Sequence, residues 1–370
     1  MNDVLVAKLG SSTLVGADGR LRTPVIEARV RDLVAARRGG GRVVLVSSGA
    51  IACGLGRLGM RGRPTALPDL QAASAIGQGA LYTRYEDALA THGAVAAQVL
   101  LTSTDLERRA SYINARNTLE RLLELDAVPI VNENDTTATD ELTFGDNDVL
   151  AAQVAILLRA RLLVLLTEGD GVYAAGPEGP ALIGEVPPGA RPEDLGLANM
   201  GPSRLGRGGV ASKVAAASMA AGAGVRCVVA SGAAEGVLPA LAGGAAGIGT
   251  AFLPAARAES AFKLWLRHAK PVMGRVRVDD GAARALRGRG TSLLPVGVLA
   301  WEGSFGVGDA VEVLDAEGDA RVGKGVAAMS ADELGEVAGL RTDEIRRRRP
   351  GASEEVIHRD QFVLDPADVG

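Results

Sequence analysis

Through the first 255 residues, short apolar runs alternate with segments in which apolar residues recur every three or four positions. The runs have the length and β-branched content of strands that are covered on both faces: 4–9, 42–46, 95–101, 128–131, 162–167 and 226–230. Helical patterns lie between them, from residue 24 onward and over 69–90, 111–124, 147–160 and 212–221. This alternation predicts a three-layer α/β/α sandwich built on an open, mainly parallel sheet.

The pattern changes near residue 255. Beyond it, short strands separated by turn residues are predicted at 274–278, 297–300, 310–314 and 320–326. We therefore expect a first domain over 1–255, a linker over 256–270 and a small β-rich domain over 271–370. The 370 residues of the chain are enough for two domains.

An uncharged stretch at 236–256 has to be weighed against membrane insertion. Pro239, Pro254 and several glycines interrupt it, so it predicts a short helix followed by a buried strand.

The net charge of −4 gives no basic field for nucleic acid. Cys53 and Cys227 have no metal or redox spacing, and the first residues lack the basic region of a signal peptide. We expect a soluble cytoplasmic protein with no membrane partner.

Several well-known catalytic signatures do not occur in the sequence. It contains no GxxxxGK[ST] phosphate loop and no set of protein-kinase motifs. The three histidines, His92, His268 and His358, fit no catalytic triad and no metal site. We therefore expect neither a histidine-based mechanism nor a protein-bound metal centre.

Polar or glycine-rich residues follow several predicted strands, at the edge where open α/β sheets bind ligands. These segments are 8–12, 47–50, 132–135 and 167–171, and polar loops at 145–148 and 206–209 precede helices. Glycine-rich turns let backbone N–H groups approach phosphate oxygens, and helix N-termini add the positive ends of their dipoles. Lys8 and Lys213 would add two positive charges. Each feature alone is more often a turn, a cap or a solvated strand end, so the prediction of an anion site depends on their shared edge.

Phosphoryl transfer suits such a site, because it depends mainly on alignment and on neutralisation of charge. A carboxylate acceptor is already ionised at neutral pH and needs no general base. The residues are therefore compatible with a kinase that works without histidine.

The same segments are similar to those of a known family. The matching stretches are 6–12, 47–52, 71–78, 114–116, 131–135, 144–148 and 208–213. With them the chain resembles the glutamate 5-kinases, which are amino acid kinases with a C-terminal PUA domain, over essentially its whole length. The Asn-Glu-Asn-Asp segment at 132–135 and the Gly-Asp-Asn-Asp segment at 145–148 distinguish this family from acetylglutamate, aspartate and uridylate kinases.

This resemblance implies transfer of the γ-phosphoryl group of ATP, with Mg²⁺, to the side-chain carboxylate of L-glutamate, the first step of proline biosynthesis. It implies that Lys8, Lys213 and Glu168 are catalytic. The residues implied to bind glutamate are Ser48, Gly49, Asp135, Asn147 and Arg116. Those implied to bind ATP are Lys8, Gly10, Thr167, Glu168, Arg207, Gly208, Gly209, Val210, Ala211, Ser212 and Lys213. Feedback inhibition by proline and a homo-oligomer, either a dimer or a tetramer, are also implied.

Two positions depart from the family pattern. Glu168 stands where the family has an aspartate that orients the two lysines, so either Glu168 or Asp170 is expected to take that role. Arg207 adds a cation before Lys213, and it either contacts the phosphate or ribose of the nucleotide or points into solvent.

The β-rich end resembles a PUA domain through residues 303–309 and the flanking strands. PUA domains often bind RNA, but this segment is poor in aromatics and has no basic stripe beyond 284–289. A structural or regulatory appendage is therefore favoured. Two alternatives to a glutamate kinase stay open: an RNA-binding protein with a secondary kinase-like domain, and an amino acid kinase that uses another acceptor, such as aspartate or acetylglutamate.

Overall fold

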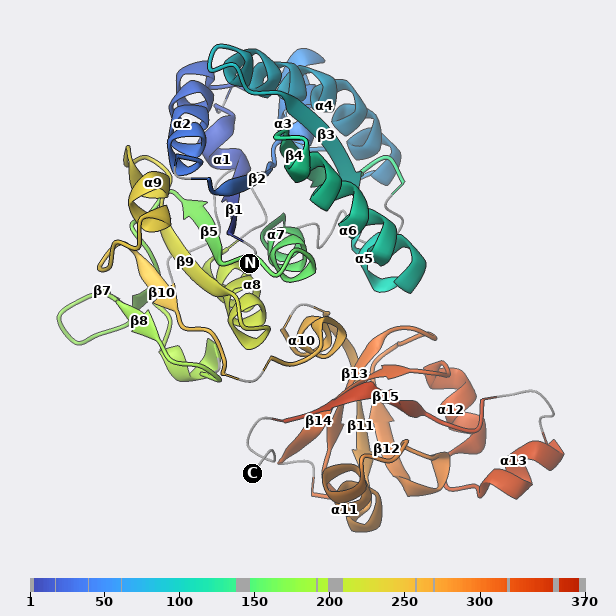
Figure 1. Cartoon of the computed structure of the whole chain (residues 1–370). Coiled ribbons are helices and arrows are strands. Elements are labelled where there is room, and N and C mark those ends of the chain that lie inside the picture. Colours follow the sequence, from blue (N-terminus) through green and yellow to red (C-terminus); the bar gives the residue numbers. More distant parts are fainter. Residues whose placement is uncertain are drawn as a thin grey trace. The chain divides into compact units, whose positions relative to one another are not determined.

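The chain divides into two compact units, residues 1–259 and 260–370 (Figure 1). The computed structural model describes residues 3–16, 18–38, 40–60, 62–137, 147–190, 192–198, 209–256, 258–268, 270–317, 320–348 and 353–365. Unit 1 contains the predicted α/β domain and unit 2 contains the predicted β-rich domain. Each unit is described by itself below.

Unit 1 is built on a sheet with the strand order β3-β4-β2-β1-β5-β9-β10-β8. Its strands are β1 (Val4–Leu9), β2 (Arg42–Val46), β3 (Ala96–Leu101), β4 (Val128–Glu133), β5 (Leu162–Thr167), β8 (Glu185–Val186), β9 (Arg226–Ser231) and β10 (Thr250–Phe252). Neighbouring strands are parallel except for the antiparallel pair of β9 and β10. A small hairpin, β6 (Tyr173–Ala174) with β7 (Ala181–Leu182), lies outside this sheet.

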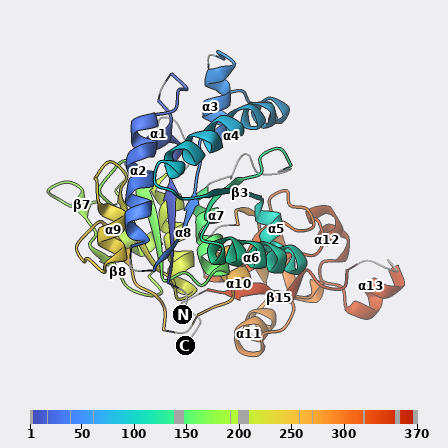
Figure 2. The ribbon, with the colours of Figure 1, turned by 45° about the horizontal axis from the view of Figure 1, so that its top comes forward.

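Helices cover both faces of the sheet (Figures 1 and 2). The helices of unit 1 are α1 (Ser11–Leu14), α2 (Thr23–Ala36), α3 (Ala50–Arg57), α4 (Leu67–Ala90), α5 (Ser103–Glu107), α6 (Arg109–Glu124), α7 (Asn147–Leu157), the 3-10 turn Pro192–Leu195, α8 (Val210–Gly222) and α9 (Val237–Ala242). Leu5, Ala7 and Leu9 of β1 belong to the core shared with α2, α4 and α9. Successive strand residues face opposite sides, so Lys8 faces the layer that contains α7 and α8. The predicted α/β/α sandwich is confirmed.

Two glycines let α3 and α4 pack with their backbones in close contact. A Cβ atom on Gly54 would lie 1.8 Å from the Ala73 carbonyl oxygen, and one on Gly77 would lie 1.9 Å from the Ala50 oxygen. No side chain fits at either position. The crossing therefore fixes α4 against α3, which begins directly after β2.

A buried ion pair within α2 makes hydrogen bonds to the loop before α9. Arg29, 2% exposed, lies 3.2 Å from the Asp32 carboxylate and donates a hydrogen bond to the Ala234 carbonyl oxygen. The Gly236 N–H donates to the same carboxylate. Arg29→Ala should lower the free energy of unfolding by about 3–5 kcal/mol, because it leaves Asp32 charged and buried without its partner. Urea unfolding checks this against Arg31→Ala, an exposed arginine of the same helix; equal shifts would contradict it.

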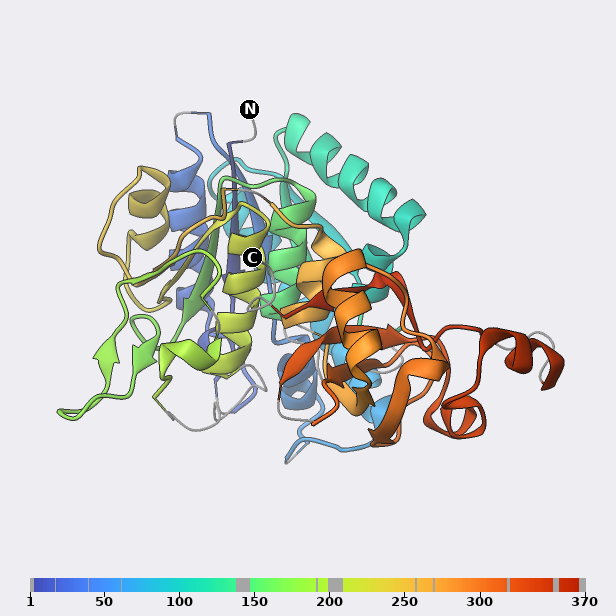
Figure 3. The same cartoon turned by 90° about the horizontal axis from the view of Figure 1, so that it is seen from below.

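Unit 2, coloured orange to red in Figure 3, contains one sheet. Its strand order is β12-β11-β13-β14-β15. The strands are β11 (Val272–Val278), β12 (Val298–Glu302), β13 (Ala310–Leu314), β14 (Arg321–Ala327) and β15 (Ile357–Leu364). The helices are α10 (Ala261–His268), α11 (Asp280–Arg289), the 3-10 turn Pro295–Gly297, α12 (Ala331–Val337) and α13 (Thr342–Arg348). Most of the stretch predicted as a linker, 256–270, belongs to this unit, because α10 packs on β14 and β15.

His268 of α10 should make unit 2 sensitive to acid. Burial, with the nearby charges of Arg267, Lys324 and Arg321, lowers the pKa of His268 to about 3. An unfolded histidine takes up a proton below about pH 6.5, whereas the folded one stays neutral. The unfolded state therefore binds more protons between these values, so stability falls as the pH falls from about 6.5 towards 3. The loss should be about 1.4 kcal/mol per pH unit.

Unfolding of unit 2 measured across this pH range tests the expectation. The His268→Gln variant should lose most of the slope, while His92→Gln in unit 1, which replaces an exposed histidine, should keep it. A slope that is unchanged in His268→Gln would contradict the assignment.

Among the described residues, no helix is both long enough and apolar enough to cross a membrane. The uncharged stretch that begins at Gly236 forms α9 and β10, as predicted.

Candidate active site

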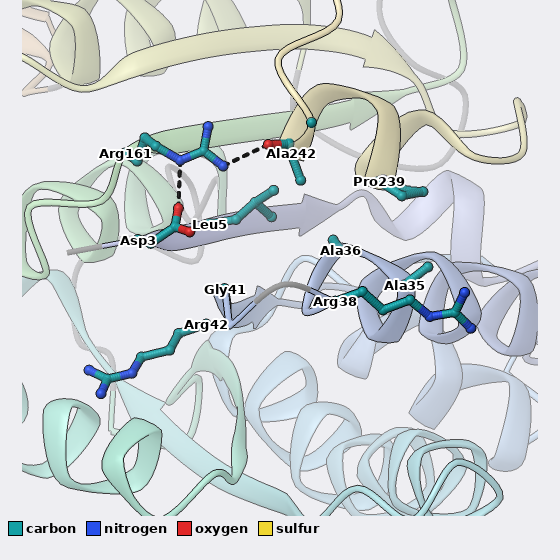
Figure 4. A pocket seen from close by; sticks show the side chains of 11 residues that line it. Asp3, Leu5, Ala35, Ala36, Arg38, Gly41, Arg42, Arg161, Pro239 and Ala242 are labelled. Carbon is teal, nitrogen blue, oxygen red and sulfur yellow. Dashed lines mark hydrogen bonds and ion pairs between the residues drawn. The ribbon is translucent and has the colours of Figure 1, made fainter. Parts of the chain in front are cut away.

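The carboxyl ends of β4, β2, β1, β5 and β9 lie side by side along one edge of the sheet. A cavity of about 140 Å³ lies at the opposite edge, lined by Asp3 just before β1, by Leu5 of β1 and by Arg42 at the start of β2 (Figure 4). Arg161 there pairs with Asp3 at 2.6 Å and donates to the Ala242 oxygen at 2.9 Å. Because open α/β sheets bind ligands at the carboxyl edge, that cavity is not the candidate active site.

One buried aspartate joins the two predicted lysines at the carboxyl edge. Asp148, in the first turn of α7, is 0% exposed. Its Oδ1 lies 2.5 Å from Lys8 Nζ, and its Oδ2 lies 2.9 Å from Lys213 Nζ in α8. The side chains of Lys8 and Lys213 are 4% and 11% exposed. The three groups together carry one net positive charge at the end of β1.

The two ammonium groups decide the charge state of Asp148. Burial alone would raise the pKa of this carboxyl, but the nearby charges of Lys8 and Lys213 and their hydrogen bonds outweigh burial. The pKa of Asp148 is therefore well below its usual value. A permanently ionised carboxylate can hold both ammonium groups in fixed positions.

The acid between the two lysines is thus Asp148, whereas the sequence analysis expected Glu168 or Asp170 in that place. Both of these residues follow β5 and are exposed. Asp148 reaches the lysines because α7 packs against both β1 and α8. Glu168 stays a predicted nucleotide-site residue.

Side-chain amides connect the ends of β2 and β4. The Asn147 amide nitrogen, buried at the start of α7, donates to the Ser47 carbonyl oxygen at 2.5 Å and to the Asn132 Oδ1 at 2.7 Å. The Asn132 amide donates in turn to Gln78 Oε1 of α4 at 2.6 Å. Asn147, which was predicted to bind glutamate, is therefore the residue next to Asp148. Its side chain is fixed by hydrogen bonds to the ends of β2 and β4.

Asp135, which was also predicted to bind glutamate, follows β4 and is 8% exposed. Its Oδ2 accepts a hydrogen bond of 2.5 Å from Ser74 of α4. Burial raises the pKa of Asp135, and the Ser74 hydrogen bond and the charge of Arg63 partly offset that rise.

Backbone groups complete the carboxyl edge. Gly49 begins α3 with φ of +96°, a conformation that glycine adopts without strain, and it follows the half-buried Ser48. Gly10 and Gly209 stand directly before α1 and α8. Thr167 ends β5, and Val210, Ala211 and Ser212 form the first turn of α8 ahead of Lys213.

Some predicted residues are not part of this cluster. Arg116 lies on α6, where it pairs with Glu120 at 3.8 Å. Arg207 and Gly208 lie outside the described residues, as do positions 145 and 146 of the polar loop before α7.

The sequence reasoning gave no role to Asp148, Asn132, Ser74 or Gln78, although each lies in a segment that it singled out. An acid in the first turn of a helix usually complements the helix dipole, so Asp148 had a simpler explanation. The signal that could have identified Asp148 was the pair of lysines. Two buried ammonium groups need a carboxylate close by, and no acid at this edge of the sheet had been firmly assigned to them.

Comparison with known proteins agrees with this geometry. The sequence pattern of the amino acid kinase family matches residues 3–231, and that of the PUA domain matches residues 274–348. The chain belongs to the amino acid kinase family and carries a PUA domain in unit 2.

Full-length relatives narrow the assignment. Proteins named glutamate 5-kinase from Streptomyces avermitilis and Myxococcus xanthus are 46% and 43% identical to the chain, over 97% of it and 96% of each relative. A solved isopentenyl phosphate kinase has 16% identity and a TM-score of 0.45, covering 67% of this chain and 99% of that one, which is too low to add to the assignment. Within the amino acid kinases, the chain therefore belongs to the glutamate 5-kinase family.

Proposed function

We propose that the protein is a glutamate 5-kinase, which transfers the γ-phosphoryl group of ATP to the side-chain carboxylate of L-glutamate. The products are ADP and L-glutamyl 5-phosphate. The observation that carries the proposal is the buried Asp148 between Lys8 and Lys213, beside Asn147 and Asp135 at the same sheet edge. The names of the relatives support glutamate as the acceptor.

In this proposal the two lysines neutralise the charge of the transferring phosphoryl group. Lys8 belongs to β1 and Lys213 to α8. Asp148 holds their ammonium groups on either side of its carboxylate, one at each oxygen. Preorganised positive charge of this kind lowers the barrier, because it needs no rearrangement when the transition state forms. Residues Gly10 and Thr167, with 207–213, are proposed to bind ATP.

The other part of the edge is proposed to hold the amino acid. Asp135 is an anion suited to the ammonium group of glutamate, and Ser48 and Gly49 offer hydrogen bonds to its carboxylates. The amide hydrogens of Asn147 already bind Ser47 and Asn132, so its side-chain oxygen is proposed to accept from the ammonium group. The side-chain carboxylate attacks the γ-phosphorus while the bond to the β-phosphate oxygen breaks, and ADP leaves with that electron pair. No side chain has to remove a proton.

The nucleotide is proposed to enter with Mg²⁺, which supplies charge neutralisation at the phosphates. Within the described residues, no group of three His, Cys, Asp or Glu side chains could hold a metal ion. Mg²⁺ commonly keeps several waters and binds through one or two carboxylates together with substrate phosphates. Glu168 and Asp170, the exposed carboxylates after β5, have the oxygen chemistry for this.

We further propose a place in proline biosynthesis in the cytoplasm, feedback inhibition by proline and a homo-oligomeric state, all by analogy with the family. Arg116 is proposed to belong to the region that senses glutamate and proline.

An acceptor panel tests the substrate assignment. ADP release with Mg²⁺ and ATP should be at least about a hundredfold faster, as kcat/KM, with L-glutamate than with N-acetylglutamate, because acetylation removes the cation that Asp135 would pair with. L-Aspartate should also be poor, because its carboxylate is one methylene short of the lysines. A preference for either alternative would replace glutamate as the acceptor.

A further inference from the structure

One face of α4 supplies hydrogen-bond partners to the carboxyl edge of the sheet. Ser74 and Gln78 are one helical turn apart, and Tyr85 lies two turns further along the same face. Ser74 binds Asp135, Gln78 accepts from Asn132, and the Tyr85 hydroxyl accepts from Ser47 Oγ at 3.0 Å. A polar face inside the molecule is unusual for a helix, and here it touches the segments proposed to hold the acceptor.

Ser74 and Asp135 form a buried contact. Their exposed fractions are 3% and 8%, and the Ser74 Oγ lies 2.5 Å from the Asp135 Oδ2. Among the described residues, Ser74 is the hydrogen-bond donor to this carboxylate. A carboxylate can accept about four hydrogen bonds, so Oδ1 retains the capacity to accept from a cation.

The backbone of α4 is held where Ser74 stands. Gly77, one turn away, packs against the Ala50 carbonyl oxygen, and Ala73, next to Ser74, packs against Gly54. Because neither contact leaves room for a shift of α4 towards α3, the Ser74 hydroxyl is a fixed donor. A fixed donor defines the orientation of the group that it binds.

We propose that Ser74 is a positioning residue for the amino-acid acceptor: its hydroxyl binds one oxygen of Asp135, so that the other oxygen is presented to the ammonium group of the acceptor. This inference rests on the proposed glutamate kinase activity. It assigns recognition of the amino group partly to α4, through Ser74.

The same contact favours the charged form of Asp135. Burial raises the pKa of Asp135, and the charged groups and donors around it that oppose this are Ser74 and Arg63. Loss of the Ser74 hydroxyl removes one of the two, so the pKa of Asp135 should rise further. Acceptor binding would then fail at a higher pH than in the wild-type protein, because a protonated Asp135 does not attract an ammonium group.

The test compares Ser74→Ala with Ser74→Thr, which keeps a hydroxyl. Thr83→Ala serves as the matched control, because Thr83 is an exposed residue of α4 whose hydroxyl donates to the Gly79 oxygen of its own helix. Ser74→Ala should raise KM for L-glutamate about tenfold and leave kcat within about twofold. It should also shift the acid limb of the pH profile of kcat/KM to higher pH. Ser74→Thr should restore the wild-type KM and the wild-type acid limb.

Glutarate, the analogue without the amino group, separates positioning from general damage to the site. As a competitor of L-glutamate, it should bind Ser74→Ala and wild-type protein with equal inhibition constants. A tenfold loss for glutarate as well, or an unshifted acid limb with an unchanged KM for L-glutamate, would overturn the positioning role. If wild-type protein shows no glutamate-dependent turnover, the proposed function itself is wrong and the role of Ser74 falls with it.

Discussion

Asp148→Asn should lower kcat about a hundredfold to a thousandfold, the range found when a fixed electrostatic contact to a transition state is removed. The amide has the same shape as the carboxylate but no charge. The repulsion between the ammonium groups of Lys8 and Lys213 would then no longer be offset by a negative charge between them. KM for L-glutamate should change much less, because Asp148 contacts the two lysines that are proposed to act on the transferring phosphoryl group. Steady-state kinetics at saturating ATP measures both values.

Stability gives a second readout for the same variant. The buried ammonium group of Lys8 would lose the negative charge of Asp148, which should lower the free energy of unfolding by about 3 kcal/mol or more. Glu168→Gln is the matched control, since Glu168 is the exposed acid that the family pattern places beside the lysines. It should leave stability unchanged within about 0.5 kcal/mol. If Glu168→Gln loses more turnover than Asp148→Asn, the lysines are oriented by Glu168.

Gly77→Ala should destabilise unit 1 by about 3 kcal/mol or more. The new methyl group would lie 1.9 Å from the Ala50 carbonyl oxygen and 2.5 Å from the Gly54 backbone nitrogen, so α3 and α4 would have to separate. Backbone atoms of two helices cannot yield as a flexible side chain does. The separation would also move Gln78 and Ser74 away from the strand ends, so KM for L-glutamate should rise in any protein that stays folded.

Gly79→Ala is a close control for this prediction. Gly79 lies two residues further along α4, and a Cβ atom there would meet no atom within 4 Å. Alanine is the better helix former by roughly 0.5–1 kcal/mol, so Gly79→Ala should be neutral or stabilising. Urea unfolding should therefore show a large loss of stability in Gly77→Ala and no loss in Gly79→Ala. Equal shifts would show that the close crossing of α3 and α4 contributes little.

The sheet was predictable because its central strands are covered on both faces. Every residue of β1 is buried, including Lys8. Strands of this kind appear in the sequence as nearly continuous apolar runs, which are easy to recognise. The polar residues at the strand ends were predictable for the same reason, since a parallel sheet gathers its carboxyl ends at one edge. These two regularities account for the confirmed fold and for the location of Lys8, Ser48 and Asp135.

Contacts between distant segments were not predictable from the pattern. Several acids follow strands along this edge, and only the packing of α7 against β1 and α8 selects Asp148 as the partner of the lysines. The pairing of Ser74 with Asp135 depends on the glycine crossing of α3 and α4, which leaves no periodic signal. Helix α10 lies in the stretch predicted as a linker, because its eight residues are fewer than the window from which helical periodicity is read, although five of them are apolar.

Trapping of the acyl phosphate is the most direct test of the kinase activity. The intact chain, incubated with ATP, Mg²⁺, L-glutamate and hydroxylamine, should form a hydroxamate in step with ADP. Both products should depend on L-glutamate, and both should fall about a hundredfold or more in Asp148→Asn. ADP and hydroxamate that do not depend on L-glutamate, or that are absent from the folded wild-type protein, would contradict the assignment.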